Sequence, residues 1–213
     1  MLGNCWEYDI RSSVIAWKMG YAKECIAALN LSGTVCDHFK HTLSYLEDKK
    51  GMMATLQYLV FAKNCEWARP AMVEIFQVKE ERGSFINDVA VVGFINEQTM
   101  LDNFLFNGIK QQRPDLLKLP YLQTQGGSPS KSKCVAFLYQ HEETMVMNIV
   151  RDALAANDKT VLASIHDAII TKEKLGVELT SAIEELMRDA TDNDYWQLGT
   201  KQLKRYAKPK LET

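Results

Sequence analysis

The chain has 213 residues, a formal net charge of −2 and 46% hydrophobic residues. This length and composition predict one large domain or two small lobes with a real core, and exclude a disordered chain. No apolar run approaches the roughly 20 residues that span a bilayer, and we find no secretory signal. Five scattered cysteines without a CxxC motif indicate reduced thiols in a cytosolic protein. Because acidic residues slightly outnumber basic ones, nucleic-acid binding would require local basic patches.

The chain begins with a segment, Trp6–Ile10, that is typical of a strand in a core. Ser12 and Ser13 then offer a helix N-cap, and residues 14–29 have helical spacing. Asp9 is therefore expected where a strand gives way to a helix. A buried strand so early in the chain also predicts neighbouring structure that lies on another chain or was cut away.

Residues 33–61 are predicted to be helical in two parts. The first part is polar and contains Cys36, His38 and His41, but a second ligand pair at zinc-site spacing is missing, which favours a solvated helix face. The second part is amphipathic and places Lys50 and Tyr58 on one side. That side could meet a triphosphate and a sugar, or the Lys stem could simply pack against the aromatic ring.

The middle of the chain leaves two questions open. The apolar run at residues 89–95 fits either a strand or a buried helix. Residues 107–131 are rich in Gly, Pro and Lys, which suits either a nucleic-acid-contacting surface or a set of connecting loops.

Towards the C-terminus we expect a helix from Pro129 to about Asn157, with Ser128 as its N-cap. Its buried stripe is predicted to consist of Leu138, His141, Met145, Ile149 and Ala153. After Gly176 a last helix should turn Leu179, Ile183 and Leu186 inward. The basic tail, residues 201–210, is expected on the surface.

Residues 160–171 consist of two short apolar runs on either side of His166 and Asp167. This pattern predicts a β-hairpin with these two residues at its tip. A carboxylate held at the end of a hairpin has a fixed direction, which suits a metal ligand. Asp167 could equally serve only to form the turn.

Three stretches, taken together, resemble the active-site motifs of phage RNA polymerases and family A DNA polymerases. Tyr8–Ser13 resembles the first motif, in which an Asp, here Asp9, ends a strand before a helix. Lys50 and Tyr58, eight residues apart, resemble the fingers helix. Ser164–Asp167 resembles the third motif, a hairpin whose Asp completes the metal pair.

The resemblance implies two-metal nucleotidyl transfer with two magnesium ions bound by Asp9 and Asp167. These two residues and His166 would form the catalytic set, with His166 orienting the end of the growing strand. Lys50 would stabilise charge on the phosphates. The nucleotide-binding set would be Lys50, Tyr58 and Arg11.

The chain departs from the family pattern at three positions. Leu46 stands where the fingers motif has an Arg, and Leu59 stands where a Gly follows the Tyr. Val14 replaces the Glu with which family A DNA polymerases exclude the ribose 2′-hydroxyl, which leans towards ribonucleotide use.

We therefore predict an α+β fold, a polymerase palm with a small antiparallel sheet and helical fingers. Residues 1–35 and 131–213 would form the palm and residues 36–130 the fingers. The favoured function is a DNA-directed RNA polymerase subunit or fragment in the cytoplasm of a bacterial or phage-infected cell. The alternatives are a family A-like DNA polymerase or phage replication protein, and a non-catalytic nucleic-acid-binding assembly subunit.

The polymerase hypothesis makes two structural predictions. The carboxylates of Asp9 and Asp167 should lie within about 4 to 8 Å of each other on adjacent antiparallel strands, close enough to share metal ions. Besides template, product and nucleoside triphosphates, we expect a protein partner that supplies the thumb and the N-terminal part of the enzyme.

Overall fold

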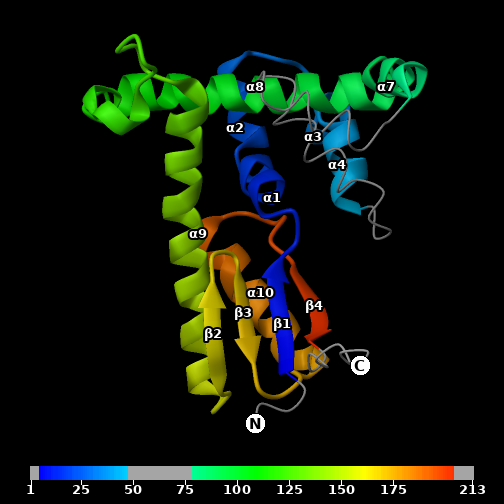
Figure 1. Cartoon of the computed structure of the whole chain (residues 1–213), viewed down its shortest axis with the longest axis vertical. Helices are drawn as coiled ribbons and strands as arrows, with labels where there is room; N and C mark the ends of the chain where they lie inside the picture. The colour runs from blue at the N-terminus through cyan, green and yellow to red at the C-terminus, as the bar shows by residue number, and fades with distance from the viewer. Residues whose placement is uncertain (1–4, 48–77, 204–213) are drawn as a thin grey trace, which may run out of the picture. The chain divides into compact units, whose positions relative to one another are not determined.

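The computed structural model describes residues 5–47 and 78–203 (Figure 1). These residues form an α+β structure, which confirms the predicted class. The chain divides into two compact units, one of residues 1–17 and 137–213 and the other of residues 18–136. In the parts of the chain so described, no helix has the length and apolar character to cross a membrane.

The first unit is built on a four-stranded sheet in the order β2-β3-β1-β4, in which all neighbours are antiparallel. The strands are β1 (Cys5–Ile10), β2 (Val161–Ile165), β3 (Ala168–Thr171) and β4 (Leu198–Leu203). The predicted first strand and the predicted hairpin are confirmed. The strand β4 was not predicted, and it includes residues 201–203, which had been assigned to the surface tail.

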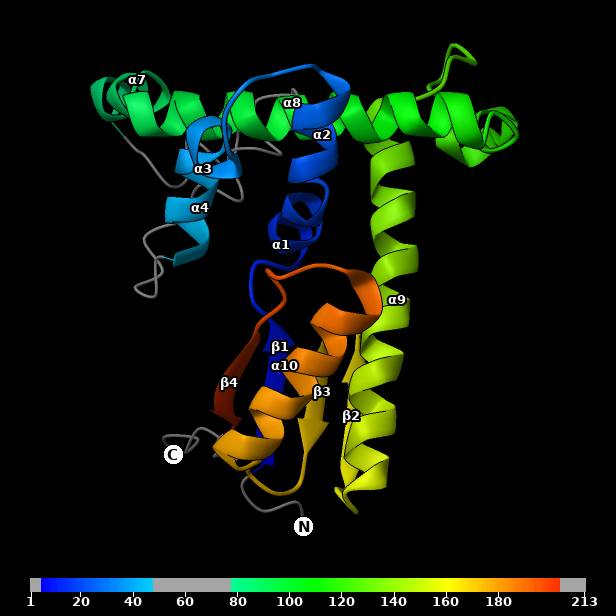
Figure 2. The ribbon, with the colours of Figure 1, turned by 180° about the vertical axis from the view of Figure 1, so that it is seen from behind.

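One face of this sheet carries the core of the first unit. Tyr8, Ile10 and Ile169 are buried there, and the helices α9 (Lys131–Ala156) and α10 (Val177–Thr191) lie over this face (Figure 2). Because successive side chains of a strand point to opposite faces, Asp9 belongs to the other face of the sheet.

The prediction that both C-terminal segments are helices is confirmed, but the side of each helix that is buried was predicted only in part. In α9 the buried side chains include Val146, Met147, Val150 and Leu154, whereas His141 and Met145 are exposed. In α10 Ile183 and Met187 are buried and Leu186 is half exposed. The predicted stripe of α9 is therefore wrong at His141 and Met145, and the predicted inward face of α10 is wrong at Leu186.

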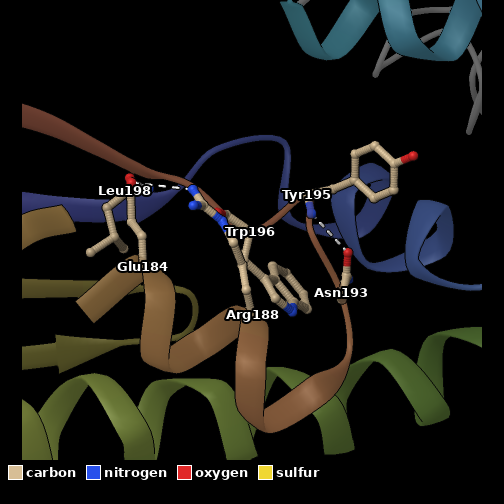
Figure 3. Close-up of polar contacts among 6 residues, drawn as sticks. All are labelled: Glu184, Arg188, Asn193, Tyr195, Trp196 and Leu198. Atoms are coloured by element: carbon tan, nitrogen blue, oxygen red, sulfur yellow. Dashed lines mark hydrogen bonds and ion pairs between the residues drawn. The ribbon is translucent and has the colours of Figure 1, made fainter. Parts of the chain in front are cut away.

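Strand β4 is held in place by polar side chains of α10 (Figure 3). Glu184 Oε1 accepts a hydrogen bond from the Leu198 backbone N–H at 2.8 Å. Arg188 Nε donates to the Trp196 carbonyl at 3.0 Å, and its Nη2 lies 3.3 Å from Glu184 Oε2. The helix thus fixes the start of β4 beside β1.

The loop between α10 and β4 is also tied to the first helix, α1 (Ser13–Gly20). The Asn193 side chain accepts from the Tyr195 backbone N–H at 3.0 Å (Figure 3) and donates to the Ala16 carbonyl at 3.1 Å. Since Asn193 is buried, these bonds satisfy its amide and link the loop to α1.

The second unit is helical in its described part. It contains α2 (Ala22–Ala28), α3 (Val35–His38), α4 (Lys40–Glu47), α7 (Lys79–Ile86), α8 (Val89–Gln112) and the short 3₁₀ turns η2 (Leu116–Lys118) and η3 (Pro120–Leu122). The helix predicted over residues 14–29 is interrupted at Tyr21, which separates α1 from α2.

Helix α8 resolves the ambiguity of residues 89–95, which form its first turns. The Asp88 side chain caps the helix by accepting from the backbone N–H groups of Ala90 and Val91. Farther along, the buried Glu97 accepts from the backbone N–H and the hydroxyl of Thr42, at 2.7 and 2.8 Å. Because the His41 backbone N–H also donates to Glu97 at 3.1 Å, this side chain satisfies N–H groups at the start of α4 that have no partner within the helix.

Candidate functional site

The sheet register brings Asp9 and Asp167 to the same end of two neighbouring strands. Asp9 pairs with Ala168 across β1 and β3. Asp167 precedes Ala168 directly, and its carbonyl accepts a hydrogen bond of 2.9 Å from the Ile10 backbone N–H. Asp9, near the end of β1, and Asp167, in the turn that precedes β3, are thus neighbours along the backbone of the sheet although they are far apart in the sequence.

His166 lies at the tip of the hairpin, between β2 and β3. Its φ angle is +49°, in the left-handed region, where His is found more often than most non-glycine residues. The side chain is exposed. The turn therefore presents an imidazole to solvent immediately before Asp167.

Asp9 occupies space that a glycine leaves open. It lies opposite Ala168 on one side and opposite Gly199 of β4 on the other. A Cβ atom at Gly199 would be 2.3 Å from Asp9 Oδ1, so only glycine accommodates this carboxylate position. Within residues 5–47 and 78–203, the Asp9 carboxylate makes no hydrogen bond or ion pair, which leaves its oxygens available to a ligand.

The Asp167 carboxylate is oriented by a serine. Ser13 Oγ donates a 2.7 Å hydrogen bond to Asp167 Oδ2, and the Ser13 side chain is buried. A tight turn after β1 puts Ser13 there: Ser12 has a φ of +46°, and its carbonyl accepts from the backbone N–H groups of Ile15 and Ala16. Ser13 donates to Oδ2 only, so Asp167 Oδ1 accepts no hydrogen bond from Ser13.

Tyr139, on α9, extends this polar group. Its hydroxyl donates to Glu143 Oε1 at 3.0 Å, and the centroid of its ring lies 5.6 Å from that of Trp17. Burial, opposed by the nearby Ser13 hydroxyl and reinforced by the charges of Glu143 and Asp167, holds the pKa of Tyr139 well above its usual value. The phenol is therefore a neutral donor at physiological pH.

The remaining predicted site residues are placed only in part. Arg11 directly follows β1; its backbone N–H donates to the Gln197 carbonyl at 2.9 Å, and its side chain is exposed. Lys50 and Tyr58 lie outside the described residues. The disfavoured zinc hypothesis at Cys36, His38 and His41 gains no support, because no group of three potential metal ligands occurs in the ranges that the structure describes.

The donor set of Asp9 and Asp167 fits magnesium. This ion prefers hard oxygen ligands and usually takes only one or two protein carboxylates, with water and phosphate oxygens completing its shell. Among the residues that the structure describes, the Asp9 carboxylate has no hydrogen-bond or ion-pair partner, and Asp167 has one oxygen outside the bond to Ser13. Each of the two residues therefore offers a carboxylate oxygen of the kind that magnesium prefers.

Sequence reasoning missed three contributors to this site. Ser13 was interpreted only as a helix cap, and Tyr139 and Gly199 were not singled out. The four-residue spacing of Tyr139 and Glu143 predicts a contact on a helix, but the roles of Ser13 and Gly199 depend on pairings across the sheet that no local pattern reveals.

Comparison with known proteins does not identify the chain. No family model matches it, and no curated protein matches its sequence.

Proposed function

We propose that this chain is the catalytic part of a template-directed nucleotidyltransferase, and specifically of a DNA-directed RNA polymerase. The observation that supports the proposal is the register of β1 against β3, which puts Asp9 beside the hairpin tip that carries Asp167. A polymerase palm requires this combination, with one Asp at a strand end and another in a neighbouring hairpin.

The chemistry assigns a role to each residue. Bound magnesium would activate the primer 3′-hydroxyl and neutralise the leaving pyrophosphate. Asp9 and Asp167 hold the cations, and the exposed His166 orients the end of the growing strand. Arg11, Lys50 and Tyr58 bind the incoming nucleotide, with the two cationic side chains neutralising its phosphates.

The fold is compatible with this assignment. A four-stranded antiparallel sheet with helices on one face is the architecture expected of a palm. In this proposal the helical second unit is the fingers. A protein partner supplies further grip on the template, because the chain itself has no excess of basic residues.

The proposal is tested by addition of a single nucleotide to a template-annealed primer, with the full-length chain in excess over primer. One turnover at high protein concentration avoids the need for processive grip. We expect magnesium-dependent addition that Asp9→Asn and Asp167→Asn each reduce by at least about 100-fold, since each removes a charge that acts on the transition state.

Asp189→Asn is the matched control, because this carboxylate is exposed on α10 and should not affect addition. Equal activity of all three variants would contradict the assignment. A wild-type chain that adds no nucleotide and binds no divalent cation would also contradict the assignment, because this is the outcome expected of a non-catalytic assembly subunit. Parallel reactions with ribonucleotides and deoxyribonucleotides separate RNA polymerase from DNA polymerase.

A further inference from the structure

The hydroxyl group of Ser13 makes a contact that helix capping does not explain. Ser13 is the first residue of α1, yet its Oγ donates to Asp167 in the hairpin. The turn N–H groups of Ile15 and Ala16 are instead satisfied by the Ser12 carbonyl. The buried hydroxyl thus links α1 to a residue 154 positions away.

We infer that Ser13 is a positioning residue for Asp167, and that the Tyr139 oxygen is a second acceptor to which Ser13 can turn its proton. The part of the inference that concerns metal rests on the proposed function. The bond to Ser13 restricts the Asp167 carboxylate to one rotamer, in which Oδ2 is held and Oδ1 is free. Without it, a carboxylate at the tip of a hairpin would be free to rotate.

Ser13 and Tyr139 each have one hydroxyl proton, and each can donate it to only one acceptor at a time. The Ser13 proton goes to Asp167 and the Tyr139 proton goes to Glu143, so neither is shared between the two hydroxyl groups, although Ser13 is close enough to Tyr139 to lower its pKa. If a cation takes Asp167 Oδ2, Ser13 can therefore turn its proton to the Tyr139 oxygen.

Ser13 therefore has two alternative acceptors for its proton, the Asp167 carboxylate and the Tyr139 oxygen. It orients Asp167 before metal binding and yields the oxygen afterwards, without leaving its own buried hydroxyl unsatisfied. Tyr139 is suited to the second position, because its proton is committed to Glu143 and its oxygen still has acceptor capacity. The ring of Trp17 packs against that of Tyr139 and limits its movement.

The first measurement needs no metal and no catalytic activity. Three-bond couplings of the Asp167 side chain, measured by NMR, report its rotamer population. We expect one dominant rotamer in the wild type, in Ser13→Thr, which keeps the hydroxyl, and in Tyr139→Phe, which keeps the Ser13–Asp167 bond. We expect rotamer averaging in Ser13→Ala. A single rotamer in Ser13→Ala would overturn the inference.

The second measurement is the dissociation constant of Mn²⁺, from the electron paramagnetic resonance signal of the free ion. Ser13→Ala should weaken binding by about two- to tenfold, because cation binding must then also order an Asp167 side chain that Ser13 no longer holds in one rotamer. Tyr139→Phe should also weaken it, although its Asp167 rotamer is unchanged, because Ser13 then lacks its second acceptor. Ser13→Thr should stay within about twofold of the wild type.

The two proposals fail in different ways. If Mn²⁺ binding is unchanged by Asp167→Asn, the metal site and the proposed function are wrong, but the rotamer measurement still decides whether Ser13 positions Asp167. If Asp167→Asn abolishes binding and Ser13→Ala changes neither rotamer nor affinity, the proposed function survives and the inference is wrong. Urea unfolding of each variant distinguishes these effects from a loss of folding.

Discussion

Gly199→Ala is a sharp test of the space around Asp9. The added Cβ would lie 2.3 Å from Asp9 Oδ1 and 3.5 Å from Arg11 Cγ, so the carboxylate has to retreat by roughly 1 Å to reach an ordinary contact of 3.4 Å. In catalytic sites a displacement of this size costs on the order of 100-fold in rate. We therefore expect single-nucleotide addition to fall by about that factor.

The same change should hardly affect the free energy of unfolding. Glycine inside a strand costs roughly 0.5 to 1 kcal/mol relative to alanine, which offsets the cost of moving a flexible side chain. The stability is measured by urea titration and the activity by single-nucleotide addition. Gly108→Ala is the matched control, because its new Cβ meets no atom within 4 Å.

A double-mutant cycle identifies the cause. If Gly199 acts only through Asp9, then adding Gly199→Ala to Asp9→Ala should have no further effect on cation binding. Full activity of Gly199→Ala, or a strong loss of stability without any change in cation affinity, would refute the argument that this glycine makes room for the carboxylate.

Three further predictions concern other parts of the chain. Glu184→Ala should lower the free energy of unfolding by about 1 to 3 kcal/mol, because it removes the acceptor of the Leu198 N–H and the partner of Arg188. The control is Glu185→Ala, at an exposed neighbouring position, which should lower it by less than about 0.5 kcal/mol in the same urea titration. The pKa of Tyr139 is raised in the folded state, so its contribution to stability should be fully present below about pH 10, the pKa of an unfolded tyrosine. Above that pH the free energy of unfolding should fall, and it should fall less steeply in Tyr139→Phe. Lys50→Ala should weaken nucleotide incorporation in the primer assay and leave the circular-dichroism melting curve unchanged, and a fully active variant would reject the role of Lys50 in nucleotide binding.

The hairpin could be predicted from the sequence because its signal is local. Apolar β-branched residues on both sides of His166 and Asp167 fix the two strands and the turn, and the structure has strands at Val161–Ile165 and Ala168–Thr171. The strand before Asp9 was equally clear. Each of these elements depends on its own residue pattern and not on partners elsewhere.

Strand β4 could not be predicted in this way. Its residues, Leu198–Leu203, are mixed in polarity, and the strand depends on pairing with β1 and on the side chains of Glu184 and Arg188. The contact between Gly199 and Asp9 follows from this pairing, so it was equally hidden. In α9, similar spacing of apolar residues fitted two adjacent stripes, and only packing selects the stripe of Val146 and Val150.

The central claim is that Asp9 and Asp167 together bind the catalytic cations. Crystals of the full-length chain soaked in Mn²⁺ would test it most directly, because the anomalous signal locates the ion. The account predicts a peak within about 2.5 Å of a carboxylate oxygen from each of Asp9 and Asp167, and its loss in Asp9→Asn. A well-ordered site with no peak there, or carboxylates too far apart to share an ion, would contradict it.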